Sequence, residues 1–586
     1  SSFISPSRLT TQVNLHLKSL LSCSPRRLYS TNFPSNFPFF ENSIRNLHGD
    51  AISLQHAGSS ITFNTSPPPF LSYSQLYTLI HQCESKLPLS HITTPKICCI
   101  SPPGINYAKW MMYAWQQEAF FIPLNWKYTL AEWQYVLEDV CPDFIIAVRV
   151  NGNEEYEKKL HALKEEYGDC LVFEDEICEM GQIEQDLESH ALTPTLSPQK
   201  DLNMSNNALM IYTSGTTSKP KGVVLTFANV LAQIETMIKP WEWSENDCLL
   251  HVLPMHHTHG IINGLGCALY SGAAVQFMHF SEKSVWNTFG NGKVTMFFAV
   301  PTIFTKLIHY YDSLNDKKEK EVLRKSCSNL RLMVSGSAAL PPPVLEYWKR
   351  ITGHTLLERY GMTEIGMCLT NPLHPESARR AGFVGKPFPG VEVKLKDQES
   401  DQDVPLLEGE SAKGELLVKG ANVFKEYWNK PEATKKEFVN GWFKTGDAVE
   451  YSEGYFRILG RQSVDIIKTG GYKVSALEIE ASLLQHERVK ECAVLGLPDK
   501  EWGEIILAII VPKHASAASP PETVPHSETA HTLADQLTAH CRKMLSNSKI
   551  PRKYHFVSHI PRNAMGKINK KSLLPFYRLT NSSNMQ

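Results

Sequence analysis

The 586-residue chain has no uninterrupted apolar run of the roughly 18 residues that a helix needs to cross a bilayer. It has no excess of either charge, since 59 Lys and Arg residues stand against 60 Asp and Glu residues, whereas nucleic-acid-binding proteins show a basic excess or stripe. Its 13 cysteines include no Cys-x-x-Cys spacing, so we expect free thiols in a reducing compartment and no zinc site. A membrane-spanning protein and a nucleic-acid binder are disfavoured, and the length suggests about three or four domain-sized units.

Acidic residues are missing from residues 1–40, which are rich in Ser and Thr and carry several basic side chains. Within this stretch, Gln12–Leu21 can form a basic amphipathic helix of the kind found in mitochondrial and plastid transit peptides. Arg27–Ser30 is similar to a mitochondrial processing site, so cleavage is expected after Tyr29. We predict a transit peptide over residues 1–40 and a location in the mitochondrial matrix; the alternative is a disordered polar tail.

From about residue 95, short apolar runs alternate with stretches of helical periodicity. Strands are expected at Lys96–Ile100, Phe120–Leu124, Phe144–Val148, Leu249–Leu253, Val294–Val300 and Leu330–Val334. A capping box of Thr129 and Glu132 is expected to open a helix before the third of these strands. Apolar strands separated by helices indicate an α/β fold with mostly parallel, helix-covered sheets. After Gly414 the strands shorten and turns become frequent, which suggests a small β-barrel-like part.

A smaller α+β unit of about 120 residues is expected after Arg461. Its predicted elements are a helix opened by a capping box of Ser475 and Glu478, strands at 491–497, 505–511 and 554–557, and a helix at 532–545. Composition predicts a disordered insertion at 514–530 and an acidic surface loop at 397–412. We therefore divide the chain into residues 1–40, a large domain at 41–462, a C-terminal domain at 463–580 and a tail at 581–586.

The segment Tyr212–Val223 gathers hydroxyls, glycines and lysines directly after an apolar strand, Asn207–Thr213. Glycine lets a backbone approach a ligand closely, while N–H groups, hydroxyls and lysine bind phosphate oxygens. No Walker pattern Gly-x-x-x-x-Gly-Lys-Ser/Thr can be placed on Gly215 or Gly222. We predict a polyphosphate loop of another kind; taken alone, the same composition also fits a mobile surface turn.

Five other segments carry side chains suited to a nucleotide site: Ser335–Pro341, Leu357–Glu364, Lys444–Asp447, Gly460–Ser475 and Pro561–Lys567. Tyr360 can stack on a base, Thr363 can donate to phosphate and Glu364 can hold Mg²⁺ through oxygen. Asp447, expected at a tight turn, can accept hydrogen bonds from both hydroxyls of a ribose. Individually, each of these residues also fits an ordinary core, turn or surface role.

In this order and spacing, the segments resemble the adenylate-forming superfamily of acyl-CoA synthetases, luciferases and peptide-synthetase adenylation domains, over roughly residues 45–580. The resemblance implies a large AMP-binding domain with a mobile C-terminal lid, and ATP, Mg²⁺ and coenzyme A as ligands. The nucleotide contacts that it implies are Thr213, Ser214, Gly215, Thr216, Thr217, Lys221, Ser337, Ala338, Glu358, Tyr360, Gly361, Asp447 and Arg461.

The resemblance also implies catalytic roles for Lys567, Thr363 and Glu364, with Glu364 as the metal ligand. It places a hinge at Ser463 and a tunnel for the pantetheine arm of CoA at Gly470 and Gly471, all within Gly460–Ser475. This chain departs from the usual pattern at Ser218, where glycine is common, and at Ser463, where Asp or Lys is common.

The implied reaction has two halves. A carboxylate, which is already ionised at neutral pH, attacks the α-phosphate of ATP and expels pyrophosphate. The thiol of CoA then displaces AMP from the acyl-adenylate. Mg²⁺ on Glu364 and the lysines would stabilise the crowded phosphate charge. Since Lys567 is needed only for the first half, we expect a domain rotation about Ser463 between the halves.

The acyl group is suggested by five segments that together resemble malonyl-CoA synthetases, in particular the mitochondrial ones: His256–Gly260, Val300–Lys306, Ser335–Leu340, Leu357–Glu364 and Val464–Lys473. A dicarboxylate needs a cation or donors for its distal carboxylate, because burying that charge alone costs several kcal/mol. The resemblance places Lys306 there, at a position where Arg is usual, although a solvated lysine is the alternative.

Malonate is therefore the expected substrate, and methylmalonate stays open. His257, Thr258 and Met362 are expected to border it; clustered histidines also fit simple packing or a metal site. The alternatives are a short- or medium-chain monocarboxylate synthetase without a buried cation, a luciferase-like oxygenase, and a silent nucleotide-binding protein. The last would be expected to have lost Lys221, Glu364 or Lys567.

Overall fold

The computed structural model of the chain describes residues 50–55, 70–89, 92–150, 152–175, 202–213, 220–397, 399–407, 409–513, 528–562 and 567–582. The expected transit peptide and most of the expected insertion at 514–530 lie outside these ranges. Ser214, Gly215, Thr216 and Thr217, at the tip of the expected phosphate loop, also lie outside them.

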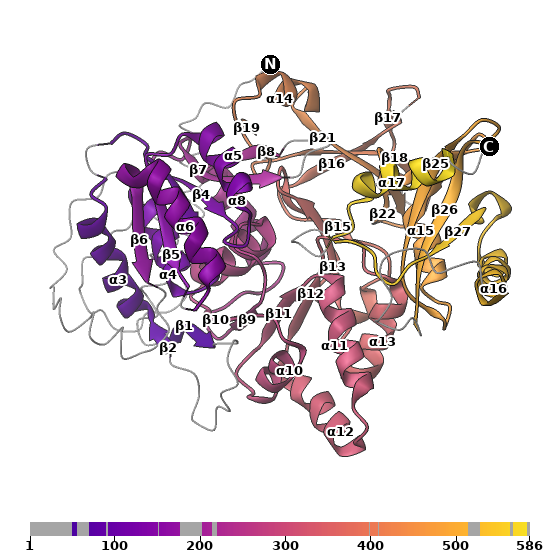
Figure 1. Cartoon of the computed structure of the whole chain (residues 1–586), viewed down its shortest axis with the longest axis horizontal. Coiled ribbons are helices and arrows are strands. Elements are labelled where there is room, and N and C mark those ends of the chain that lie inside the picture. Colours follow the sequence, from indigo (N-terminus) through magenta and orange to yellow (C-terminus); the bar gives the residue numbers. More distant parts are fainter. Residues whose placement is uncertain are drawn as a thin grey trace.

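The first layer is a seven-stranded sheet with a mostly parallel centre (Figure 1). Its strand order is β19 (Glu426–Tyr427), β8 (Lys221–Thr226), β7 (Asn207–Thr213), β4 (Phe120–Leu124), β3 (Lys96–Ile100), β5 (Phe144–Arg149) and β6 (Leu171–Asp175). Side chains alternate along these strands, so one face packs on α5 (Leu130–Val140) and α6 (Glu154–Tyr167). The other face packs on α3 (Tyr73–Lys86) and the almost fully buried α4 (Ile105–Gln116).

The second layer is a nine-stranded sheet. Its order is β15 (Lys386–Pro387), β14 (Gly366–Thr370), β13 (Leu357–Met362), β12 (Leu332–Ser335), β11 (Met296–Ala299), β9 (Cys248–His251), β10 (Ala274–Met278), β1 (Asp50–Gln55) and β2 (Phe70–Ser72). Its outer face is covered by α10 (Glu282–Gly290), α11 (Pro301–Ser313), α12 (Lys317–Ser326) and α13 (Pro342–Thr352). Between the two sheets lie α8 (Phe227–Ile238), the π-helix η2 (His259–Gly266) and α9 (Cys267–Ser271), which share one core with α3 and α4.

A third, antiparallel sheet completes the part that we term the large domain. It contains β17 (Asp403–Val404), β16 (Glu392–Lys396), β18 (Ser411–Lys419), β21 (Trp442–Ser452), β20 (Phe438–Val439) and β22 (Tyr455–Arg461), next to α14 (Pro431–Glu437). The acidic segment 397–412, expected as a loop, contributes β17 and the first residues of β18.

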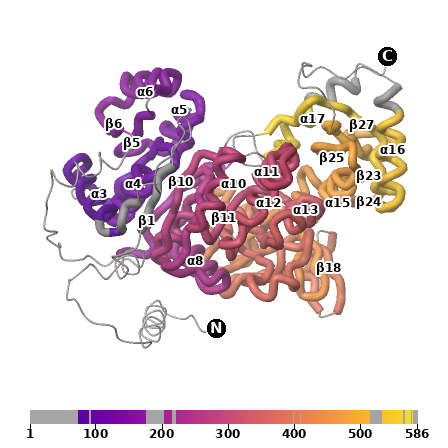
Figure 2. The backbone as a smooth tube through the Cα atoms, turned by 90° about the horizontal axis from the view of Figure 1, so that it is seen from below, coloured from indigo at the N-terminus to yellow at the C-terminus, as the bar shows by residue number. Residues whose placement is uncertain are grey.

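The elements after Arg461 form what we term the small domain. Its sheet contains β24 (Tyr472–Ser475), β23 (Ile466–Thr469), β26 (Gly503–Pro512), β25 (Val489–Asp499) and β27 (Lys553–Phe556), with α15 (Ala476–Leu483), α16 (Glu528–Met544) and α17 (Lys570–Ser582). In Figure 2 this domain, in yellow, and helices α3 to α6, in indigo and purple, lie at opposite ends of the molecule.

The α/β class and the mostly parallel, helix-covered sheets predicted from the sequence are confirmed. Both hydrogen bonds of the capping box predicted at Thr129 and Glu132 are present. The second predicted box forms only half: Ser475 accepts from the Glu478 N–H, but the carboxylate of Glu478 pairs with Lys549 at 2.7 Å instead. No helix within the described ranges combines the length and the apolarity required to cross a membrane.

Candidate active site

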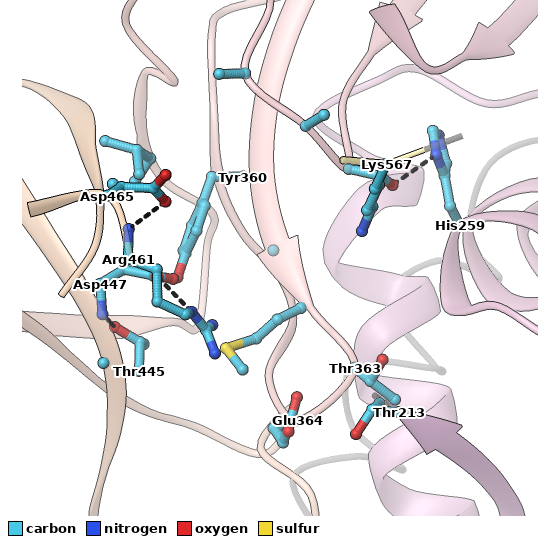
Figure 3. Close-up of a pocket in the computed structure, with 18 of the residues that line it drawn as sticks. Thr213, His259, Tyr360, Thr363, Glu364, Thr445, Asp447, Arg461, Asp465 and Lys567 are labelled. Atoms are coloured by element: carbon cyan, nitrogen blue, oxygen red, sulfur yellow. Dashed lines mark hydrogen bonds and ion pairs between the residues drawn. The ribbon is translucent and has the colours of Figure 1, made fainter. Parts of the chain in front are cut away.

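A cavity of about 1300 Å³ lies where the large domain meets the small one. Its walls come from the ends of β7 and β8, the segment after β12, β13 with its following turn, and β21 and β22. The small domain contributes Lys567, Asp465 and residues of α15 (Figure 3). The predicted site residues that line it are Thr213, Lys221, His257, Thr258, Ser337, Ala338, Glu358, Tyr360, Gly361, Met362, Thr363, Glu364, Asp447, Arg461 and Lys567. The fold thus collects residues from distant parts of the sequence around one space.

Asp447 lies at a β-bulge and not at the tight turn expected from the sequence. The pairing of β21 with β18 shifts at this point, and Gly446 adopts a left-handed φ of 71°. The Asp447 carboxylate accepts hydrogen bonds from the Tyr360 hydroxyl and, at 3.0 Å, from Arg461 Nε (Figure 3). An aromatic ring and a carboxylate held together in this way suit a base and its ribose.

Glu358 is a second buried carboxylate on the same wall. The Gly382 N–H donates to it at 2.9 Å, and burial raises the pKa of Glu358 to about 8. At pH 7 the side chain is therefore mostly protonated, so it offers one donor and one acceptor to a ligand. This is the pattern that the polar edge of a base requires.

Polar side chains gather at the end of the cavity near β7 and β8. Thr213 and Lys221 are paired in register at the ends of these antiparallel strands. Lys221 Nζ lies 4.7 Å from the centre of the Tyr427 ring, and the Tyr427 hydroxyl donates to Glu364 at 3.0 Å. This end therefore offers a cation and a buried carboxylate beside the expected phosphate loop.

A magnesium ion fits this donor set. Among the described residues, no group of three or more His, Cys, Asp or Glu side chains is arranged to hold a metal. Mg²⁺ needs no such cage in nucleotide sites, because phosphate oxygens and water complete its shell around one or two carboxylates. Burial raises the pKa of Glu364, and a cation arriving with a nucleotide would stabilise its ionised form.

Lys567 reaches the cavity from the small domain and is half-buried. Burial lowers the pKa of Lys567 to about 8, and the charges of Arg359 and Arg461 lower it further. A lysine beside two arginines indicates a space built for an anion.

The charge of Lys567 predicts a pH dependence for chemistry on a bound anion. Its pKa in the fold is below the ordinary value for lysine, so the ammonium is lost as the pH rises through about 8. We expect kcat/KM for adenylation to fall about tenfold per pH unit above that point, because kcat/KM reports groups of the free enzyme. Lys567→Arg, whose guanidinium stays charged, should remove this limb from the profile. A wild-type profile that is flat from pH 7 to 9.5 would contradict the assignment.

Arg359 is a buried cation that the sequence analysis did not select. Its side chain packs directly on the backbone after β12, since a Cβ at Gly336 would lie 2.5 Å from the guanidinium. The residue is 3% exposed, it lines the cavity, and neither Nε nor Nη2 has a hydrogen-bond partner among the residues that the structure describes. Its charge helps to lower the pKa values of His257, His259 and Lys567, so these groups lie near one another.

The histidines beside Arg359 cannot share its electrostatic role. Burial lowers the pKa values of His257 and His259 well below the ordinary value, so both rings are neutral at pH 7. Nδ1 of His259 bonds the Ser337 hydroxyl at 3.1 Å, and no described residue bonds Nε2. Arg359 is therefore the charged group of this part of the cavity wall.

The structure does not place Lys306 at the cavity, where the sequence analysis expects it. Lys306 lies on α11 with its side chain exposed, its Nζ is 5.5 Å from the centre of the Phe280 ring, and it does not line the cavity. The physical reason is the rotation of α11, which turns Phe304 and Leu307 into the core and Lys306 outward.

Gly470 and Gly471 also lie away from this cavity, in the turn between β23 and β24. They adjoin a second cavity of about 590 Å³, lined by Thr469, Tyr472, Lys473, Val474, Trp502, Ser546, Asn547, Ser548, Lys549 and Arg552. This lining holds three cations and no carboxylate, and Arg552 stacks on Trp502 at 3.5 Å from the ring centre.

Comparison with protein families settles the class of the chain. The family model described as AMP-binding enzyme matches residues 61–428, and the model of the AMP-binding enzyme C-terminal domain matches residues 478–567. The chain belongs to the AMP-binding enzyme family. This AMP-binding enzyme thus carries both parts of the family, and the second match ends at Lys567.

Relatives and solved structures agree with this assignment. The enzyme is 40% identical to the human mitochondrial malonate–CoA ligase ACSF3, over 81% of each chain, and 45% identical to a malonate–CoA ligase of Arabidopsis thaliana, over 63% of this chain and 60% of that one. It superposes on ATP-bound MatB from Rhodopseudomonas palustris with a TM-score of 0.76 and 27% identity, covering 93% of this chain and 99% of the other. It superposes on a malonyl-CoA ligase in complex with methylmalonyl-CoA and AMP with a TM-score of 0.58 and 30% identity, covering 90% of this chain and 98% of the other.

Arg359 could have been found in the sequence of this AMP-binding enzyme. It is the one basic residue of β13, and it stands next to Tyr360, which the analysis did select. A charge inside a strand of a helix-covered sheet is rarely buried without a ligand or a partner.

Proposed function

We propose that this enzyme is an ATP-dependent malonate–CoA ligase of the mitochondrial matrix. It joins malonate to CoA through a malonyl-adenylate and releases AMP and pyrophosphate. The relatives named as malonate–CoA ligases support the reaction, and those named as mitochondrial support the location together with the composition of residues 1–40. The observation that carries the choice of acid is the unpaired donor set of Arg359 in the cavity.

Arg359 selects for a second carboxylate because its charge is desolvated in the cavity wall. A buried guanidinium with free donors is strongly unfavourable until an anion meets it, and breaking a buried ion pair costs about 3–5 kcal/mol. The distal carboxylate of malonate supplies that anion and accepts from Nε and Nη2. The alkyl tail of a monocarboxylate would leave the charge unpaired, so selectivity follows from the cavity wall itself. Met362 and Thr258, which also line the cavity, would border the methylene.

The first half-reaction follows from the other groups in the cavity. Tyr360 and Asp447 hold the nucleoside, and Glu358 faces the base. Lys221 and Lys567 place positive charge around the α-phosphate, where the proximal carboxylate attacks and pyrophosphate leaves. Mg²⁺ held by Glu364 would neutralise phosphate charge. No general base is required, because the attacking carboxylate is ionised at pH 7.

The second half-reaction requires a different arrangement of the domains. In this structure Lys567 lines the cavity while Gly470 and Gly471 lie outside it, which supports separate steps for Lys567 and for the glycines. Rotation of the small domain about the turn at Ser463 would withdraw Lys567 and bring the glycines to the acyl-adenylate. The cationic cavity beside the glycines suits the phosphates of CoA, and Trp502 and Tyr472 suit its adenine.

A pyrophosphate-release screen tests the proposed reaction. The purified enzyme is supplied with ATP and Mg²⁺ and with malonate, methylmalonate, succinate, acetate, propionate or butyrate, with and without CoA. Malonate should give the highest kcat/KM, and thioester should appear only with CoA. Highest activity on a monocarboxylate would replace the proposed substrate, and pyrophosphate release without thioester would overturn the ligase assignment.

A further inference from the structure

A buried ion cluster lies behind the cavity in the small domain. Lys570 Nζ is 2.6 Å from Asp465 Oδ1 and 2.6 Å from Glu480 Oε1, and the three side chains are 9%, 14% and 15% exposed. Asp465 and Glu480 line the cavity, whereas Lys570 does not. Lys570 therefore cannot act on a substrate directly.

The position of Lys570 in its helix is electrostatically unfavourable. It is the first residue of α17, where the helix dipole is positive and acidic side chains are preferred. Burial alone would lower the pKa of Lys570, and only the carboxylates of Glu480 and Asp465 raise it above its ordinary value. The charge of Lys570 is therefore stabilised at this position by its two carboxylate partners. We infer that the ion pairs between Lys570 and these carboxylates have a function of their own.

The two carboxylates connect Lys570 to different parts of the molecule. Glu480 Oε1 also accepts from the Val494 N–H at 2.8 Å, so this arm is anchored in the core of the small domain. Asp465 Oδ2 accepts from the Arg461 N–H at 2.9 Å, across the turn that contains Ser463 (Figure 3). Arg461 in turn donates to Asp447 at 3.0 Å. One arm therefore ends in the small domain, and the other ends at the nucleotide wall of the large domain.

Lys570 is also only three residues beyond Lys567. A chain spans at most about 3.3–3.6 Å per residue, so fixing Lys570 keeps the backbone of Lys567 within about 10 Å of it. On the other side of the loop, Arg562 forms an isolated antiparallel bridge with Ile568. The bridge holds Ile568 and the ion cluster holds Lys570, so the residues that follow Lys567 are fixed relative to the turn at Ser463.

We propose that Lys570 is a positioning residue for adenylation: its bond to Asp465 holds the Lys567 segment against the turn between the domains while Lys567 faces the nucleotide. The inference rests on the proposed function, since it assumes that Lys567 serves the first half-reaction. Rotation at Ser463 would separate Arg461 from Asp465, so the hinge-side arm belongs to the adenylating arrangement only. The arm through Glu480 stays within the small domain in both arrangements.

Measurement of the two half-reactions separately tests this inference. In Lys570→Met, carboxylate-dependent ATP–pyrophosphate exchange should fall about 10- to 100-fold, as expected when a catalytic group is misplaced by about 1 Å. Thioester formation from supplied malonyl-adenylate and CoA should change less than about twofold. Lys570→Arg, which keeps the charge, should restore most of the exchange rate. Lys571→Met, at the exposed neighbouring position, is the matched control and should behave as wild type.

The carboxylate variants separate positioning from mere stability. Asp465→Asn should reproduce the loss of exchange, and not of thioester formation, at temperatures well below its unfolding transition. Glu480→Gln should lower the unfolding temperature and both half-reactions together. Equal losses in both half-reactions for Lys570→Met and Asp465→Asn would reduce the cluster to a structural ion pair and overturn the inference. If the wild-type enzyme shows no exchange with malonate, the proposed function is wrong. If the wild type shows exchange but the variants lose both half-reactions equally, only the role of Lys570 is wrong.

Discussion

Replacement of Lys567 by alanine is expected to lower the rate of adenylation about 10²- to 10³-fold, the effect of removing one preorganised group that stabilises transition-state charge. The reason is local: Lys567 stands in the cavity with Arg359 and Arg461, and the small domain contributes no other lysine to the lining. The attack of a carboxylate on the α-phosphate brings two anions together, so loss of this cation raises the barrier more than it weakens binding of ATP. Carboxylate-dependent ATP–pyrophosphate exchange measures the effect.

The same variant should retain thioester formation from malonyl-adenylate and CoA. By then the phosphoryl chemistry is complete, and the proposed rotation has taken Lys567 out of the cavity. Lys571→Ala, on the exposed side of α17, is the control for unfolding of this segment. A parallel loss of both half-reactions in Lys567→Ala would show that a single domain arrangement serves both steps.

Local sequence features predicted much of the fold. The strands at Lys96–Ile100, Phe120–Leu124 and Asn207–Thr213 were predicted to the residue, because buried strands of a parallel sheet read as short apolar runs with polar borders. The capping box at Thr129 needs only a four-residue pattern, and it formed as predicted. The predicted residues that line the cavity come from motifs recognised by their order along the chain. This holds even where the local structure of a motif was predicted incorrectly, as for the turn expected at Asp447.

What the sequence could not supply depends on pairing between distant strands and on helix rotation. The local sequence around Asp447 is typical of a turn. The register shift between Glu415 and Leu417 of β18 instead makes Asp447 part of a bulge in a long strand. The π-helix at His259–Gly266 has no distinctive sequence signal, although such turns recur at functional sites. The preference for Arg359 over Lys306 as the proposed anchor rests on the outward face of α11 and on the closeness of Gly336 to Arg359, and both depend on tertiary structure.

Replacement of Arg359 by methionine is expected to reverse the choice of acid. The side chains are similar in length, so the cavity keeps its volume while its wall loses the charge. The kcat/KM for malonate should fall about 30- to 5000-fold, which corresponds to the 2–5 kcal/mol typical of breaking a buried charge pair. The kcat/KM for butyrate should stay constant or rise, because an alkyl tail no longer leaves a guanidinium unpaired. Pyrophosphate release with each acid measures the ratio.

Lys306→Met is the matched control, because Lys306 is the cation that the sequence favoured and the structure places on the surface. It should leave the ratio of malonate to butyrate unchanged. A shift of that ratio in Lys306→Met would mean that α11 turns toward the cavity when substrate binds, and that the anchor is Lys306 after all. An equal loss of kcat/KM for malonate and butyrate in Arg359→Met, with an unchanged unfolding temperature, would place Arg359 at the phosphates. A contact with the nucleotide affects the reaction of every acid, whereas a contact with a distal carboxylate is made only by a dicarboxylate.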